Sequence, residues 1–318
     1  MLNDDGFFSS HVTEENIAEL NARQSLECER RICELYELAC DAADATVKMY
    51  ADGYGIYEIL GILSDGLALD ESYAEHSAAQ MNRDKIASYL RAVSVRDKAT
   101  FTRLFFSELT DRGIVLHESD FLTQKPRPDS IAYVKNRLAD EAYDVFSEQL
   151  SDPRVAYVTS FKDAARAVSS GEVGYCLLPL EERGGARFAG ISELLFSEDL
   201  KINSVTPVFG FDGSADMKYA LVSRSFTVPE LLEDDDRYLE IRIDAERVGA
   251  LSEIFSVADT LGASVYRVNT ALFRIEGTDL TEYTVVFKRS GAAFSELLLY
   301  FTLFSGDYSA VGIYKNLE

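Results

Sequence analysis

Long apolar runs are missing from this chain of 318 residues, and so is any signal for export. No run approaches the ~18 consecutive apolar residues that a membrane-spanning helix needs. The N-terminal stretch MLNDDGFFSSHVTEEN is acidic and lacks the basic start and apolar core of a signal peptide. We therefore expect a cytoplasmic protein that has no membrane partner.

Metal-binding and disulfide patterns are also missing. The three histidines are scattered and the four cysteines form no C-x-x-C pair, so we expect neither a metal site nor a disulfide framework. Cys28 continues a stripe of apolar residues at helical spacing and is expected in the core. The acidic run Glu233–Asp236 is typical of a linker. Because the G-x-S-x-G, Walker and G-x-G-x-x-G motifs are absent, no cofactor is expected.

Basic residues are scarce relative to acidic ones. The chain has 31 Lys and Arg against 54 Asp and Glu, which gives a net charge of −23. Nucleic acids and anionic membranes would repel such a protein, so neither is expected as a partner.

The first segment, residues 1–122, has a helical pattern. Apolar residues recur every three or four positions from Cys28 to Ala43, on a helix that starts near Glu14 and ends near residues 51–55. Residues 69–94 are predicted as a second helix. Residues 94–113 are predicted as a third, with Ser94 and Asp97 at cap spacing and Gly113 just past its end. Residues 123–130, with two prolines, are predicted as a linker.

Two further segments follow, and each alternates strands with helices. In residues 130–226, apolar strands at 131–134, 154–160 and 173–180 alternate with helices, and another strand begins at Lys218. Strands this apolar favour a parallel sheet covered by helices. Residues 237–318 follow the order βαββαβ, which is typical of a ferredoxin-like fold.

Two stretches resemble known families. The sequence VGALSEIF, with Gly249, Ala250 and Leu251, resembles the proline-glycine-alanine-leucine turn of ACT domains, which sense amino acids. Residues 160–202, SFKDAARAVSSGEVGYCLLPLEERGGARFAGISELLFSEDLKI, are similar to prephenate dehydratase. Bifunctional members of that family carry a helical chorismate mutase domain in front. The resemblance implies a helical domain, a periplasmic-binding-type parallel α/β domain and a C-terminal ACT domain.

The resemblance also implies a place in the phenylalanine branch of aromatic amino-acid synthesis, with Glu181 and Lys218 at catalytic positions. The departures weaken this implication. Met217 and Lys218 replace the family's threonine-arginine pair. Only 36 residues lie between Glu181 and Lys218, and part of them is already the helix expected at ISELLFS. One βαβ unit alone needs ~30 residues, so a second lobe is hard to build there. We therefore expect a truncated, catalytically impaired protein with a regulatory or ligand-sensing role. The alternative is an active dehydratase with rearranged residues.

Two other interpretations stay open, and two further predictions follow from the C-terminal segment. The turn after Glu181 is also compatible with a simple solvated chain reversal in which Arg183 pairs with an acid. Arg23, Arg30, Arg31 and Lys48 would suit a chorismate mutase, although surface solubility explains them more simply. An amino-acid effector is expected at the ACT turn, at the residues Gly249, Ala250, Leu251, Asn269 and Thr270. Finally, the uniformly apolar stretch Leu297–Phe304 predicts a homodimer in which the chain's own sheet and a partner chain cover it.

Overall fold

A computed structural model describes residues 14–68, 90, 93–122, 128–150, 153–210, 215–226, 237–244, 250–275, 278–288, 294–304 and 308–317. Most of the predicted second helix and the acidic run Glu233–Asp236 lie outside these residues. Within the described ranges, no helix combines the length and apolar character that crossing a membrane requires.

The N-terminal region is helical, as predicted. It consists of α1 (Glu14–Ala51), α2 (Ile56–Ala68), α4 (Val95–Asp111) and the short 3-10 helix η2 (Glu118–Phe121). Helix α4 starts where the sequence indicated, because the Ser94 hydroxyl accepts a hydrogen bond from the Asp97 amide at 3.2 Å. Gly113 follows the helix with a φ of 85°. Helix α2 was not predicted.

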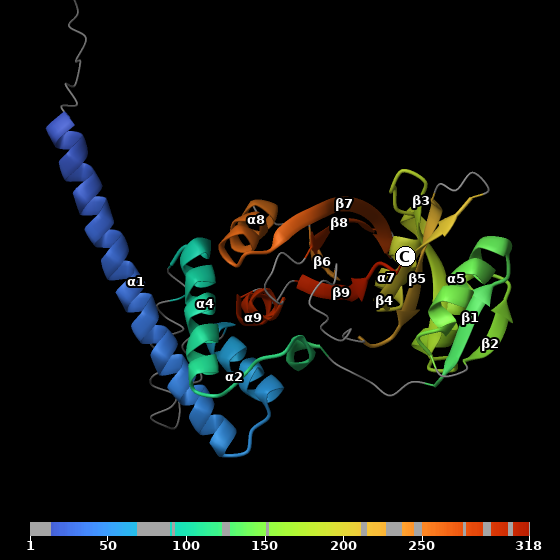
Figure 1. The fold of residues 1–318 in the computed structure, drawn as a ribbon, viewed down its shortest axis with the longest axis horizontal. Helices are drawn as coiled ribbons and strands as arrows, with labels where there is room; N and C mark the ends of the chain where they lie inside the picture. Colours follow the sequence, from blue (N-terminus) through green and yellow to red (C-terminus); the bar gives the residue numbers. More distant parts are fainter. Residues whose placement is uncertain are drawn as a thin grey trace, which may run out of the picture.

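Helix α1 packs beside α4, and its N-terminal part projects beyond that helix, away from the rest of the molecule (Figure 1). The predicted apolar stripe is buried at Leu35 and Ala39, where α1 packs against α4. Cys28 is exposed and Ile32 is 47% exposed. The prediction that Cys28 belongs to the core is therefore wrong, because this part of α1 borders an open cleft beside the start of α4 and does not pack closely against it.

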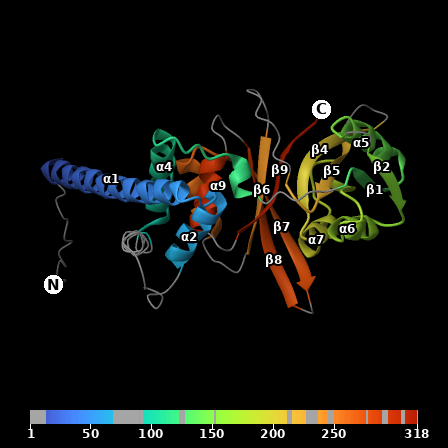
Figure 2. The same cartoon turned by 90° about the horizontal axis from the view of Figure 1, so that it is seen from below.

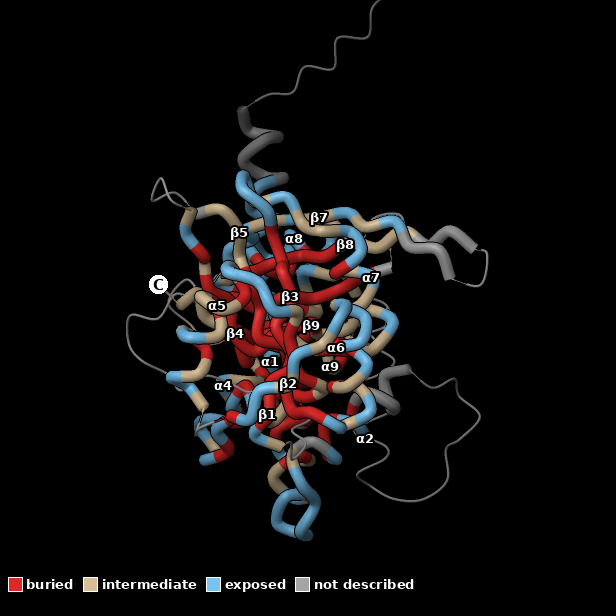
Figure 3. The backbone as a smooth tube through the Cα atoms, turned by 90° about the vertical axis from the view of Figure 1, so that its right-hand side faces the viewer, coloured by how far each residue is buried: buried red, intermediate tan, exposed pale blue. Residues whose placement is uncertain are grey.

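The strands in the described part of the chain form one sheet of nine, in the order β2-β1-β3-β5-β4-β9-β6-β8-β7. Buried residues run through these strands at the centre of the molecule (Figure 3). The strands are β1 (Ser130–Val134), β2 (Arg154–Val158), β3 (Tyr175–Glu182), β4 (Lys201–Phe209), β5 (Ala215–Ser223), β6 (Arg237–Asp244), β7 (Ser264–Ile275), β8 (Thr278–Lys288) and β9 (Tyr308–Lys315).

The first half of the sheet is mixed, not wholly parallel as predicted. Strands β2, β1 and β3 are parallel and alternate with α5 (Arg137–Ser147) and α6 (Phe161–Ser169), whereas β5 runs antiparallel to both β3 and β4. Strand β4, which follows α7 (Ala189–Ser197), was not predicted. Its polar residues Asn203, Ser204 and Thr206 interrupt the apolar pattern. They are buried all the same, because Asn203 donates to Ser223 at 2.7 Å and Ser204 to Gln149 at 3.0 Å.

The second half of the sheet follows the predicted order β6, α8 (Ala250–Thr260), β7, β8, α9 (Ser295–Phe304), β9. Its strands lie in the order β9-β6-β8-β7, and all of the pairs among them are antiparallel. Strands β4 and β9 pair through Ile202 and Gly312 and so join the two halves.

Helix α9 lies between this half of the sheet and the N-terminal helices (Figure 2). Its residues Leu298 and Phe301 belong to the core formed with the sheet and α8. Leu299 and Leu303 belong instead to the core formed by α1, α2 and α4. The chain itself thus covers the apolar stretch that was expected to meet a partner. The burial of α9 within the chain gives no reason to expect a dimer through this helix, and the oligomeric state stays a prediction.

Candidate functional site

The two residues predicted as catalytic lie side by side in the sheet. Glu181 of β3 and Lys218 of β5 are directly opposite each other, with the Lys218 Nζ 3.5 Å from the Glu181 Oε2. A register shift between Pro179 and Glu181 interrupts the regular pairing at this point. Such irregularities redirect side chains. Glu181 is buried, so its charge requires partners.

The main partner of Glu181 is Arg267 of β7, which sequence analysis missed. Its Nη1 donates to the Glu181 Oε1 at 2.6 Å and to the Gly185 carbonyl at 3.1 Å. A second register shift, between Val265 and Arg267, lies beside it. Burial lowers the pKa of Arg267, but the adjacent Glu181 outweighs that effect and raises it. The sequence signal that could have pointed to this pair is Arg267 itself, the single charged residue in the stretch SVYRVNTAL, because a lone cation in a partly buried strand needs a counter-ion.

The turn after β3 brings this arginine and the carboxylate together. Gly184 and Gly185 have φ values of 96° and 85°, which side-chain-bearing residues rarely adopt. A Cβ atom on Gly185 would lie 3.2 Å from the Arg267 Nη2. Arg183 points to the surface, 4.0 Å from Asp216. This contact is the one that the solvated-turn interpretation expected.

A second ion pair lies deeper, beside the first. Arg187 follows the turn and binds Glu240 of β6 through two contacts of 2.5 Å, and the Tyr314 hydroxyl donates to the same carboxylate at 3.1 Å. Burial lowers the pKa of Arg187, but Glu240 more than compensates and raises it. Burial and the charge of Glu240 raise the pKa of Tyr314 well above its usual value. The hydroxyl therefore stays protonated and serves as a donor.

Little space is left around Glu181. The cavity there has a volume of about 10 Å³ and is lined by Glu181, Lys218 and Arg267 together with Leu180, Val205, Tyr238, Tyr266, Val286, Tyr314 and Asn316. A single water needs about 10–15 Å³, and ligand pockets usually have several hundred. As it stands, the site admits at most one water.

The predicted effector residues are spread over two elements. Gly249 lies outside the described residues, Ala250 begins α8, and Leu251 packs at the edge of the core beneath that helix. Asn269 and Thr270 lie on β7. Thr270 is exposed, whereas the Asn269 Nδ2 is buried and has no hydrogen-bond partner within the described part of the chain.

The effector residues on β7 and those at the start of α8 lie toward the same end of the sheet. Asp244, where β6 ends, and Ala271 of β7 are both opposite Glu282 of β8. Two strand spacings separate them, or about 10 Å. The structure therefore places Asn269 and Thr270 near the end of β6, from which the chain continues to α8.

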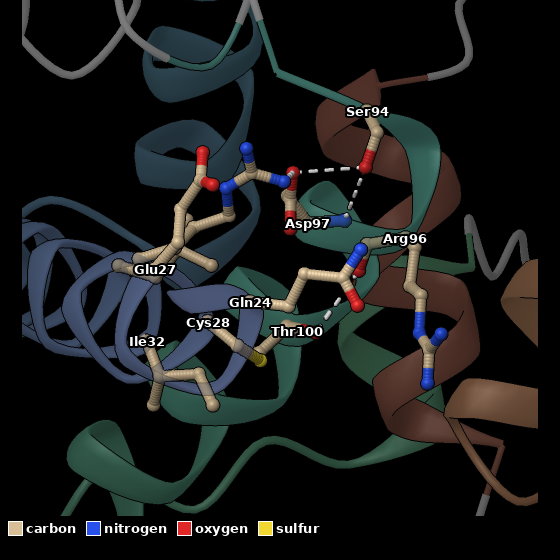
Figure 4. Close-up of a pocket in the computed structure, with 10 residues that line it drawn as sticks. Gln24, Glu27, Cys28, Ile32, Ser94, Arg96, Asp97 and Thr100 are labelled. Atoms are coloured by element: carbon tan, nitrogen blue, oxygen red, sulfur yellow. Dashed lines mark hydrogen bonds and ion pairs between the residues drawn. The ribbon is translucent and has the colours of Figure 1, made fainter. Parts of the chain in front are cut away.

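A wider cleft lies between α1 and α4 (Figure 4). It has a volume of about 480 Å³ and is lined by Gln24, Glu27, Cys28, Arg31, Ile32, Leu35, Ser94, Arg96, Asp97 and Thr100. Four cations suggested a chorismate mutase, and of these only Arg31 lines the cleft. Its guanidinium pairs with the Asp97 carboxylate at 3.3 Å. The cleft thus carries both signs of charge and does not gather the predicted cations.

No family model and no curated protein matches this chain. Several solved structures share part of its fold. Prephenate dehydratase from Streptococcus mutans has a TM-score of 0.46 and 15% identity, over 59% of this chain and 99% of that one. The prephenate dehydratase from Arthrobacter aurescens, in complex with L-Phe, has a TM-score of 0.45 and 12% identity, over 58% of this chain and 90% of that one. GqqA, described as a novel type of quorum-quenching acylase, has a TM-score of 0.42 and 19% identity, over 58% of this chain and 94% of that one. Likeness at this level carries no conclusion about function.

Proposed function

We propose that this chain is a catalytically impaired prephenate dehydratase-like protein with a regulatory or ligand-sensing role in the phenylalanine branch of aromatic amino-acid synthesis. The resemblance of residues 160–202 to that family supports the lineage. The closed surroundings of Glu181 support the loss of catalysis, and this observation carries the proposal.

The chemistry of dehydration explains why closure matters. Prephenate is a dianion that loses water and carbon dioxide. Its reaction therefore calls for cations or amides at two carboxylates, an acid beside the leaving hydroxyl, and an enclosed space. Here Arg267 and Lys218 already face the carboxylate of Glu181, and the nearby Arg187 is held by Glu240. Met217, in the position of the proton donor, has no proton to give.

The sensing role would belong to the C-terminal half. Asn269 offers a buried amide donor without a partner in the described structure, and Thr270 offers a hydroxyl one residue further on. Because consecutive side chains of a strand point to opposite faces, one amino-acid effector would use one of these two groups, as a hydrogen-bond partner for its carboxylate or its ammonium group. Cytoplasmic location and self-association complete the proposal.

The deciding experiment is a coupled assay for phenylpyruvate with purified full-length protein. We expect no production above the uncatalysed rate. Turnover by the wild type that disappears in Glu181→Ala would support the alternative, an active dehydratase with rearranged residues. The matched control is Glu182→Ala, because Glu182 is adjacent but exposed. A melting screen with aromatic amino acids tests the sensing role, since a ligand that binds only the folded state raises the melting temperature.

A further inference from the structure

Two residues after β9, Asn316 and Leu317, cross from the second half of the sheet to the first. Strand β9 itself belongs to the second half, where each residue of β6 from Arg237 to Ile243 pairs with it. Beyond β9, Asn316 pairs instead with Val205 of β4, and the Leu317 amide donates to the Val205 carbonyl at 2.7 Å. In Figure 1 the last part of β9 accordingly runs toward β4 and β5.

The side chains of these two residues serve different purposes. Asn316 lines the cavity around Glu181. Leu317 packs on the opposite face, against the core formed by α5 and the strands of the first half, since consecutive side chains of an extended segment point to opposite faces. Its carbonyl also accepts a hydrogen bond from the buried Thr206 hydroxyl at 3.2 Å. Leu317 thus anchors the segment, and Asn316 covers the cavity.

The hold of this segment on β4 is light. In the described structure β4 pairs with β9 at Ile202 and Gly312, and the next pair along is Val205 with Asn316. Both Asn316 and the following leucine are only half-buried. A segment with so few contacts can open locally while the rest of the fold stays intact. Strand β9 can therefore remain on β6 when the two residues leave β4.

The groups behind the segment have unmet hydrogen-bonding capacity. The Glu181 Oε2 is buried and has no hydrogen-bond partner in the described part of the chain, although the Lys218 Nζ lies 3.5 Å away. A buried acceptor in this state costs free energy until water or a ligand reaches it. Lifting Asn316 would join the small cavity to solvent and bring a donor to that oxygen.

We propose that Asn316 and Leu317 form a strap that closes the Glu181 site from within the same chain and opens it by leaving β4. The closed surroundings of Glu181 are then one state of the site, held by the strap. Because the strap continues β9, the second half of the sheet controls access to a site in the first half. The inference rests on the proposed function in one respect, that Glu181 marks the former catalytic position.

Thiol labelling of the full chain tests the strap. Val205 is 1% exposed, lines the same cavity and pairs with Asn316, so Val205→Cys reports access to the site. The fully buried Cys176 of β3 is kept as a probe of global opening. The other cysteines are replaced by serine: Cys28, Cys33 and Cys40. Labelling with N-ethylmaleimide, read by peptide mass spectrometry, should be slow at position 205 and slower still at Cys176.

Two variants release the strap by different means. Leu317→Asp sets a charge against an apolar core and should raise the labelling rate at position 205 about ten- to a hundredfold, the factor that the burial of one leucine corresponds to. Thr206→Val keeps the side-chain volume and removes the hydroxyl that binds the Leu317 carbonyl, so it should raise the rate about fivefold. The matched control is Leu26→Asp on α1, where the side chain is 67% exposed, and it should leave the rate unchanged.

Faster labelling at position 205 with an unchanged rate at Cys176 is the result that the strap requires. A rate at position 205 that Leu317→Asp does not raise would overturn the proposal. So would an equal rise at Cys176 and position 205 in Thr206→Val, because the whole fold would then be opening. Labelling with the native strap as fast as in the urea-unfolded chain would show that the site is not closed at all. These rates do not involve turnover, so the phenylpyruvate assay can succeed or fail independently of them.

Discussion

Replacing Arg187 with methionine gives the sharpest test of how the two halves of the sheet are held together. The change removes the guanidinium and keeps a long apolar side chain. It leaves the Glu240 carboxylate, which is fully buried, with the Tyr314 hydroxyl as its remaining hydrogen-bond donor in the described part of the chain. Arg187 itself is only 8% exposed, so water does not readily take its place.

The magnitude follows from burial. Breaking a buried ion pair by removing one partner costs about 3–5 kcal/mol, because the remaining charge is left without compensation. Tyr314 still donates one hydrogen bond at 3.1 Å, so we expect the lower end of that range, about 3 kcal/mol. Removing both charges in Arg187→Met/Glu240→Leu should recover most of the loss, since no unpaired charge remains.

Urea denaturation followed by circular dichroism measures the free energy of unfolding for each variant. The matched control is Arg137→Met, whose pair with Glu141 is about 44% exposed, and it should change stability by less than about 1 kcal/mol. An Arg187→Met variant as stable as this control would refute the reasoning. So would a double variant that is less stable than Arg187→Met alone.

Two further changes probe packing and titration. Gly174→Ala should cost about 2–3 kcal/mol in the same denaturation assay, because its Cβ would lie 1.8 Å from the Pro128 carbonyl oxygen, whereas Gly190→Ala has no neighbour within 4 Å and should be neutral or stabilising. Burial raises the pKa of Glu296 above its usual value, so this side chain binds a proton more tightly in the folded protein than in the unfolded chain. The folded protein therefore loses stability as the pH rises from the usual pKa of the group through the raised one. Glu296→Gln should therefore gain stability relative to the wild type as the pH rises above the ordinary glutamic-acid pKa of about 4.3. A difference that does not change with pH would contradict the assignment.

Local patterns in the sequence determined most of the individual elements. The cap at Ser94 and the glycine at 113 fixed the ends of α4, because both act through hydrogen bonds and dihedral angles within a few residues. Alternating apolar segments gave the strands and helices of the second half of the sheet in their correct order. The paired glycines after β3 indicated the turn there. All of these signals depend on near neighbours in the chain.

Tertiary structure alone decided the surroundings of those elements. The polar strand β4 could not be recognised until Ser223 and Gln149 supplied its hydrogen bonds. Helix α9 looked like an interface because its cover, the N-terminal helices, comes from the far end of the chain. Glu181 looked available for catalysis because its partner Arg267 lies 86 positions away on another strand. A sequence pattern specifies which side chains need burial or a counter-ion, but only the folded topology brings the groups that satisfy them within a few ångströms.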